Sequence, residues 1–192
     1  MDTLRLTENC DLTDSLVLAG CRAGDTGSLV ELVRELSPVA WRIAFRMLAD
    51  NEAAEDVAQE AMVKVWKKIG RLDNDGSFGP WFYRIVVNCC YDELRRKKRE
   101  MAKPADELTW HRLGEIIRGD DGSEPTADEY GEIMRTVTAE LSPKQRAVFV
   151  LSDLEGMNNE RISEITGLNA NSLKSNLYHA RKKVKEIIRG RY

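Results

Sequence analysis

The stretch ERISEITGLNANSLKSNLYHARKKVK, residues 160–185, is the part of the sequence that decides the fold. It predicts a short helix, a tight turn and a longer second helix. Gly167 can adopt the left-handed backbone that ends a helix, and the side chain of Asn169 can cap the helix that follows. Apolar residues recur along the second helix at spacings of four, three and four, which is typical of one buried stripe: Leu173, Leu177, Ala180 and Val184.

The face of this second helix opposite the stripe is polar and basic. Because successive residues turn by about 100°, this face carries Asn171, Ser175, Tyr178, His179 and Lys182, with Lys174 and Arg181 beside it. A short helix, a glycine turn and a basic second helix favour a helix-turn-helix, whose second helix can enter the DNA major groove. An ordinary helical hairpin is the alternative that this stretch alone leaves open.

Length and composition set the class of protein. The 192 residues are enough for one large or two small domains. No stretch approaches the ~20 uninterrupted apolar residues of a transmembrane helix, so no membrane insertion is expected. The first residues, MDTLRLTENCDLTD, lack the basic and apolar regions of a signal peptide. We therefore expect a cytoplasmic protein.

Charge is strongly segregated along the chain, although the net charge is only −3. Residues 84–103 contain seven basic and three acidic side chains, and residues 171–192 contain seven and one. Residues 104–140, between them, contain three basic and ten acidic side chains. Two basic segments flanking an acidic one indicate two separate contacts with a polyanion. The alternative is that these charges lie on solvated helix faces.

Helical periodicity recurs from residue 14 onwards and strand signals are absent, so the sequence predicts an all-α protein. Residues 1–13 show little periodicity. Residues 102–129 are acidic and contain several Gly and Pro residues, which is typical of a linker. We predict two small helical domains, residues 14–101 and 130–192, joined by this acidic linker.

Residues 52–69 predict a helix with an acidic and partly apolar surface. Asp56, Gln59 and Glu60 lie in its first half, and Val63 and Trp66 add apolar character outside its main buried stripe. An exposed aromatic beside carboxylates indicates a protein-docking face. The alternative is that Trp66 belongs to the core.

A polar loop, GRLDNDGSFG at residues 70–79, precedes a long helix that opens with Pro80 and ends in Arg95-Arg96-Lys97-Lys98-Arg99. Such a loop can hold an unstacked base, and the basic helix can contact phosphates. The aromatic residues at the start of the helix, Trp81 and Phe82, are expected in the core.

Metal or redox chemistry has little support. The four cysteines, Cys10, Cys21, Cys89 and Cys90, form no CxxC pair, and the chain has only two histidines. We expect reduced cysteines that pack as small apolar groups, no metal and no cofactor. Because ligand clusters and a Gly-rich phosphate loop are also absent from the sequence, an enzyme is the least favoured class.

Three segments, in this order, resemble extracytoplasmic-function (group IV) sigma factors of bacteria, and the resemblance covers about residues 14–188. AAEDVAQEAMVKVW is similar to the family's D-x-x-Q-E-x-(F)-x-x-x-W signature. FGPWFYRIVVNCCYDELRRKKR is similar to F-x-x-W-L-Y-R-I-x-x-N-x-x-x-D-x-x-R-R. LSPKQRAVFVLSDLEG and the helix-turn-helix after it resemble the promoter-reading domain.

The resemblance implies a promoter-specificity subunit with core RNA polymerase and promoter DNA as partners and an anti-sigma factor as its regulator. The residues implied to bind core polymerase are Asp56, Gln59, Glu60, Val63 and Trp66. Those implied to bind the −10 element are Asn74, Ser77, Phe78, Arg84, Asn88, Arg95 and Arg96. Those implied to bind the −35 element are Asn171, Ser172, Lys174, Ser175, His179, Arg181 and Lys182.

The chain departs from the family at Asn176 and His179, where arginine is usual. The resemblance therefore does not predict which DNA sequence the chain reads at the −35 element. The rival interpretation is a helix-turn-helix regulator that binds duplex DNA without polymerase. Such a regulator does not need the acidic cluster of Asp56, Gln59 and Glu60. Co-purification with core polymerase distinguishes a sigma factor from such a regulator.

Overall fold

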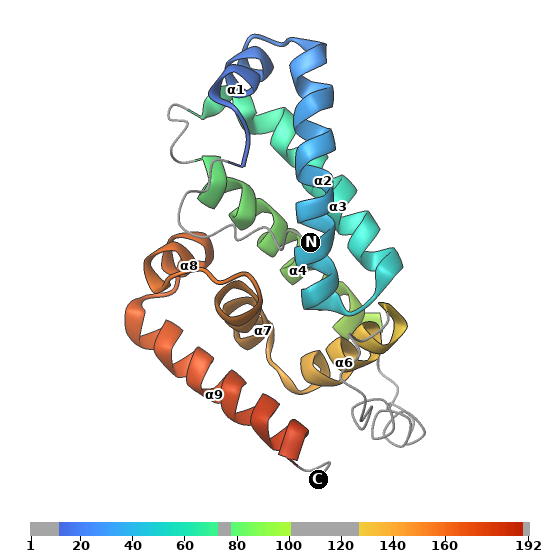
Figure 1. Ribbon diagram of the computed structural model, residues 1–192, viewed down its shortest axis with the longest axis vertical. Helices are drawn as coiled ribbons and strands as arrows, with labels where there is room; N and C mark the ends of the chain where they lie inside the picture. Colours follow the sequence, from blue (N-terminus) through green and yellow to red (C-terminus); the bar gives the residue numbers. More distant parts are fainter. Residues whose placement is uncertain (1–11, 73–77, 101–126, 190–192) are drawn as a thin grey trace, which may run out of the picture.

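The computed structural model describes residues 12–72, 78–100 and 127–189, and all regular structure in these ranges is helical (Figure 1). The all-α prediction is therefore confirmed. The N-terminal elements are α1 (Ser15–Arg22), α2 (Thr26–Leu48), α3 (Asn51–Lys68), the 3-10 turn η1 (Ile69–Arg71) and α4 (Phe78–Glu100). The C-terminal elements are α6 (Ala127–Glu140), α7 (Pro143–Phe149), the π-helical turn η3 (Val150–Leu154), α8 (Asn159–Thr166) and α9 (Ala170–Arg189).

Helix α2 is the central element of the N-terminal half. The side chain of Asp25 accepts a hydrogen bond from the Ser28 amide and caps the helix. Pro38 suggests the start of a new helix or a kink, but it lies inside one continuous helix of 23 residues. A proline costs the helix one internal hydrogen bond, and burial of a long apolar stripe offsets that cost. The stripe comprises Leu32, Leu36, Ala40, Ile43 and Met47.

Helices α3 and α4 complete this half by packing against α2 and against each other. The Asp50 carboxylate caps α3 by accepting from the Ala53 amide at 3.0 Å. Aromatic residues at the start of α4 fill the centre, where Phe82 and Tyr83 are buried. The expected core position of Phe82 is confirmed, while Trp81 is half-buried at the edge of the same cluster.

The C-terminal half contains the expected helix-turn-helix. Helix α8 ends at Gly167, whose φ of 71° is the left-handed conformation predicted from the sequence. The Asn169 side chain accepts from the Ser172 amide at 2.8 Å and so caps α9. Leu173, Leu177 and Ala180 are buried, as their spacing predicts.

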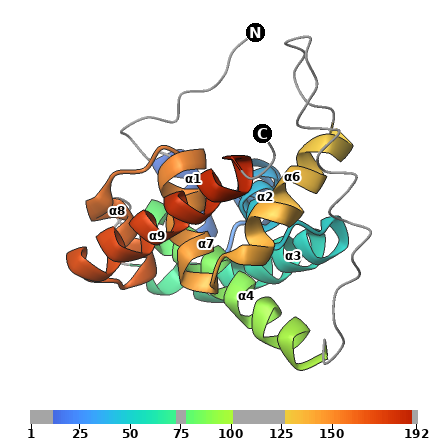
Figure 2. The same ribbon diagram turned by 90° about the horizontal axis from the view of Figure 1, so that it is seen from below.

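The two halves share one buried apolar cluster, which contains residues of α2, α3 and α4 together with residues of α7, η3, α8 and α9. Helix α4 lies beside α8 and α7, and both views show the C-terminal helices against the N-terminal ones (Figures 1 and 2). The sequence leaves open whether the halves lie together or apart. In this structure they are packed together.

Candidate functional surfaces

The outer face of α3 presents the acidic and apolar residues singled out from the sequence. Its inner face buries alanines, valines and Met62 against α2 and α4. Met62 therefore belongs to the core, whereas Trp66 is 59% exposed and does not. The residues of this outer face, all exposed, are Asp56, Gln59, Glu60, Val63 and Trp66.

The α3 face is extended by an open groove between α2 and α3. The groove has a volume of about 640 Å³, and its lining includes Val33, Pro38, Gln59 and Met62. Glu60 forms an ion pair of 2.7 Å with Lys64 one turn later. A half-exposed indole and valine next to carboxylates and an open groove suit contact with another protein, because apolar contact area and charge complementarity occur together there.

The loop before α4 lies partly outside the described residues, including Asn74 and Ser77. Phe78 differs from the exposed residues of this set. It is only 2% exposed and packs on Trp81 and Phe82, with ring centroids 5.9 and 6.3 Å away. Its ring is part of the core in this arrangement, and its role at the −10 element stays a prediction.

The outer side of α4 presents the other residues expected at the −10 element. Arg84, Asn88, Arg95 and Arg96 are all exposed. The guanidinium of Arg84 donates to the main-chain carbonyl of Glu164 in α8, so this end of the face meets the helix-turn-helix. Arg95 and Arg96 form ion pairs with acidic residues three positions earlier on the same helix, at 2.9 and 2.7 Å.

The outer face of α9 carries the residues expected at the −35 element. Asn171, Lys174, Ser175, His179, Arg181 and Lys182 are exposed, and Ser172 is half-buried because its amide is used in the helix cap. A groove of about 560 Å³ runs along this helix. It is lined by Asn159, Lys174, Leu177, Tyr178, Arg181, Lys182 and Lys185.

Four residues that line this groove are absent from the predicted −35 set: Asn159, Leu177, Tyr178 and Lys185. Tyr178 is 64% exposed and stands edge-on to His179, with ring centroids 5.4 Å apart. Lys185 lies one turn beyond Arg181. The spacing of four that links Lys174 to Tyr178 and Tyr178 to Lys182 is the signal that places the tyrosine on this face.

Arg181 is held by the carboxylate of Asp153 in the π-helical turn η3. Its Nε donates to Asp153 Oδ2 at 2.9 Å and its Nη2 to Asp153 Oδ1 at 2.5 Å. The hydrogen bond with Asp153 raises the pKa of Arg181 above its ordinary value. Asn176, which stands where the family usually has arginine, is half-buried and donates to the Ser172 carbonyl at 2.8 Å. Asn176 therefore stabilises the helix and is not part of the outer face.

The described cysteines, Cys21, Cys89 and Cys90, are free and buried, and Cys89 Sγ accepts from Lys64 Nζ at 3.3 Å. Burial raises the pKa of Cys89 and of Cys90, which disfavours the reactive thiolate. In the part of the chain that the structure describes, no group of three His, Cys, Asp or Glu side chains is placed to hold a metal ion. None of the helices in these ranges is long and apolar enough to cross a membrane.

Two family models match the chain in the order of these surfaces. Sigma-70 region 2 matches residues 32–100, which include α3 and α4, and Sigma-70, region 4 matches residues 131–184, which include the helix-turn-helix. Together they cover well over half of the sequence. The chain therefore belongs to the sigma-70 family. Within that family it is of the extracytoplasmic-function type.

Relatives that match most of the chain carry the same family name. The ECF RNA polymerase sigma factor SigW of Bacillus subtilis is 25% identical over 175 residues, which is 88% of this chain and 92% of the relative. The ECF RNA polymerase sigma factor SigM of Mycobacterium tuberculosis H37Rv is 25% identical over 181 residues, covering 92% of this chain and 85% of the relative.

Solved structures share the fold. CnrH, in complex with the cytosolic domain of CnrY, superposes with a TM-score of 0.67 at 19% identity over 91% of this chain and 96% of that one. The sigma factor RpoE of Bartonella quintana, in complex with the anti-sigma factor NepR, gives 0.59 at 20% identity over 81% and 95%.

Proposed function

We propose that this chain is a promoter-specificity subunit that directs bacterial RNA polymerase to −35 and −10 elements and helps to melt DNA for initiation. The observation that carries the proposal is the combination of an exposed acidic and aromatic face on α3 with basic faces on α4 and α9. A protein that only binds DNA has no use for the first of these. The relatives named above are sigma factors of RNA polymerase.

In this role the exposed face of α3 docks on core polymerase through Asp56, Gln59, Glu60, Val63 and Trp66. The loop before α4 and the exposed face of α4 engage the −10 element through Asn74, Ser77, Arg84, Asn88, Arg95 and Arg96. Helix α9 reads the −35 element through Asn171, Ser172, Lys174, Ser175, His179, Arg181 and Lys182. We add Tyr178 and Lys185 to this last set because they line the same groove.

The division of labour follows the proposed domains, residues 14–101 for polymerase and −10 contacts and residues 130–192 for the −35 contact. The chain acts without a catalytic site of its own, since polymerase supplies the chemistry. Control by an anti-sigma factor is part of the proposal. RpoE was solved with the anti-sigma factor NepR, and the exposed apolar side chains of α3 are suited to coverage by a protein.

The docking face is tested by changing Asp56, Gln59 and Trp66 together to alanine. All three side chains are exposed, so the fold and the melting temperature are expected to persist. Binding to purified core polymerase, measured by co-purification or by fluorescence anisotropy, is expected to fall by at least tenfold, since interface aromatics and central charges contribute most to binding. Unchanged polymerase binding would refute the docking assignment. Leu16→Ala, which removes an exposed apolar side chain from α1, is the matched control.

A further inference from the structure

One buried acidic side chain links the two halves of the molecule, in addition to the shared apolar cluster and a hydrogen bond of 3.2 Å from Arg146 Nη1 to the Met47 carbonyl. The Glu155 carboxylate, at the end of η3, accepts from two arginines of α2: Arg42 Nη2 at 3.0 Å and Arg46 Nη1 at 2.6 Å. The Glu155 side chain is only 6% exposed. Arg46 Nη1 also donates to the Leu154 carbonyl at 2.9 Å.

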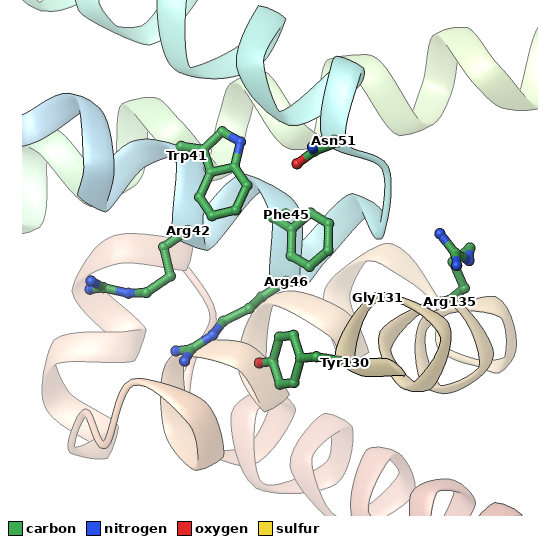
Figure 3. A pocket seen from close by; sticks show the side chains of 8 residues that line it. All are labelled: Trp41, Arg42, Phe45, Arg46, Asn51, Tyr130, Gly131 and Arg135. Carbon is green, nitrogen blue, oxygen red and sulfur yellow. The ribbon is translucent and has the colours of Figure 1, made fainter. Parts of the chain in front are cut away.

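Aromatic side chains lie beside these charged groups at the contact between the two halves, which is called the seam below. Arg42 and Arg46 extend from α2 towards the C-terminal segment, beside a pocket lined by Trp41, Phe45 and Tyr130 (Figure 3). The pocket has a volume of about 340 Å³. Phe45 of α2 stacks on Tyr130 of α6 here, with ring centroids 6.3 Å apart, so charged and apolar contacts between the halves lie side by side.

In the same closed arrangement the predicted −10 face meets the helix-turn-helix. Arg84 of the α4 face donates to the main chain of α8, the first helix of the helix-turn-helix. The −10 and −35 elements are by their names about 25 base pairs apart, which is roughly 85 Å of duplex at 3.4 Å per base pair. The 23-residue helix α4 is only about 35 Å long at 1.5 Å per residue. Two faces on halves that are packed against each other in this way cannot reach elements so far apart.

We propose that Glu155 with Arg42 and Arg46 is a latch, which holds the isolated chain in a closed form that cannot engage both promoter elements. The inference rests on the proposed function only in identifying the open chain as the form that reads DNA. The latch acts within the chain itself and needs no bound inhibitor. Core polymerase and promoter DNA select the open form, in which each half contacts its own site.

The physical basis is the difference in solvation between the two forms. In the closed form the carboxylate is almost fully buried and accepts from both guanidinium groups, and Arg46 has the Leu154 carbonyl as a second acceptor. In the open form all three groups are hydrated. Removing the carboxylate therefore penalises only the closed form, which keeps two neighbouring cations without their partner. Loss of one member of a buried, hydrogen-bonded charge pair typically shifts an equilibrium by at least about 30-fold.

The test is small-angle X-ray scattering of the full chain, without polymerase or DNA. The radius of gyration is expected to increase in the order wild type, Glu155→Gln, Glu155→Lys, because the lysine adds a third cation to the latch. The double variant Arg42→Gln/Arg46→Gln is expected to open the chain from the other side of the seam, without any change in the helix-turn-helix half. Helix content by circular dichroism is expected to be unchanged in all of them.

Glu31→Lys is the matched control, since Glu31 forms an exposed contact of 4.0 Å with Arg34 within α2. It has the same charge change as Glu155→Lys and is expected to stay compact. A wild type that is already extended would refute the latch, as would Glu155→Lys and the double arginine variant remaining compact. If Glu155→Lys unfolds, the radius of gyration of the double arginine variant decides whether the latch exists.

Run-off transcription separates this inference from the proposed function. A chain that initiates with core polymerase while every variant stays compact refutes the latch alone. Variants that open as expected, in a chain that never initiates, refute the proposed function and leave the latch standing. If both hold, Glu155→Lys is expected to give more initiation than wild type when the chain is limiting.

Discussion

Asp50 shows at the scale of one residue how the N-terminal half is held together. Its Oδ1 accepts from the Ala53 amide and caps α3, while its Oδ2 accepts from Lys97 Nζ of α4 at 2.6 Å. The hydrogen bond from Lys97, followed by that from the Ala53 amide, lowers the pKa of Asp50. One carboxylate thus fixes the start of the candidate polymerase-docking helix and ties it to the candidate −10 helix.

Changing Asp50 to alanine is expected to lower the free energy of unfolding by about 1–2 kcal/mol, because it removes a helix cap and a partly exposed ion pair. Asp50→Asn keeps an acceptor for the cap and loses only the charge, so its cost should be smaller. Urea unfolding at neutral pH measures both. Equal costs in the two variants would mean that the cap contributes little.

The lowered pKa of Asp50 also predicts a pH dependence. A carboxyl with a depressed pKa in the folded state contributes stability above its unfolded pKa of about 3.9, and this contribution is lost as the pH falls through the folded value. The difference in unfolding free energy between wild type and Asp50→Asn is therefore expected to shrink as acid is added below that range. A difference that stays constant down to the lowest pH at which the chain folds would contradict this assignment.

Phe78 illustrates what a motif leaves open at the residue scale. The family pattern identifies the position but not the direction of the side chain, which here points into the aromatic cluster. Phe78→Ala is expected to cost about 3–5 kcal/mol, the usual price of removing a buried ring, as measured by denaturant unfolding. A variant of normal stability with weakened binding to single-stranded DNA would contradict this core role and favour direct contact with DNA.

Trp66 and Met62 show why exposure is hard to predict from periodicity. They are four residues apart on one helix, and both lie beside the main stripe. The structure buries Met62 and leaves Trp66 59% exposed, because α2 and α4 cover only part of the circumference of α3. How far neighbouring helices extend is a tertiary property that the sequence of one helix does not contain.

At the scale of elements, local signals predict most of the C-terminal half. Gly167 and Asn169 mark the turn, and Ser142 with Gln145 forms a capping box at the start of α7. The π-helical turn η3 was not predicted, and it includes Asp153, the partner of Arg181. Pro38 does not begin a new helix, because burial of the apolar stripe keeps α2 continuous from Thr26 to Leu48.

The recognition helix α9 gives a prediction about salt. Lys174→Ala and Lys182→Ala are each expected to weaken binding to a random-sequence duplex and to reduce the slope of log K against log salt concentration by about 1, because each removes one phosphate contact. Titrations at several salt concentrations measure the slope. Lys67→Ala, which removes an exposed charge from α3, should leave it unchanged. If both α9 variants kept the wild-type slope of log K against log salt concentration, the duplex would bind to a face other than that of α9.

At the scale of the whole molecule, the packing of the two halves could not be predicted. The pair of Arg42 and Glu155 is separated by 113 residues, and no local pattern links a cation on one amphipathic helix to a carboxylate at the end of another. The segregation of charge indicated two contacts with a polyanion. It did not indicate that the closed chain would engage one contact face with the helix-turn-helix.

The closed and open forms explain how so small a protein can have three working faces. The α3 face is exposed in the closed form, so polymerase can dock before the chain opens, whereas the α4 face meets α8 through Arg84. Initial docking through α3, followed by separation of the halves, is the order of events that this arrangement favours.

Run-off transcription with purified core polymerase on a library of promoter fragments tests the central claim most directly. The account predicts specific initiation that requires the chain and is lost when Asp56, Gln59 and Trp66 are replaced together. Selected fragments should share two sequence elements, one read by the α4 half and one by α9. Sequence-specific binding of the chain to duplex DNA by itself, with no initiation when core polymerase is added, would contradict the account and favour a regulator that acts without polymerase.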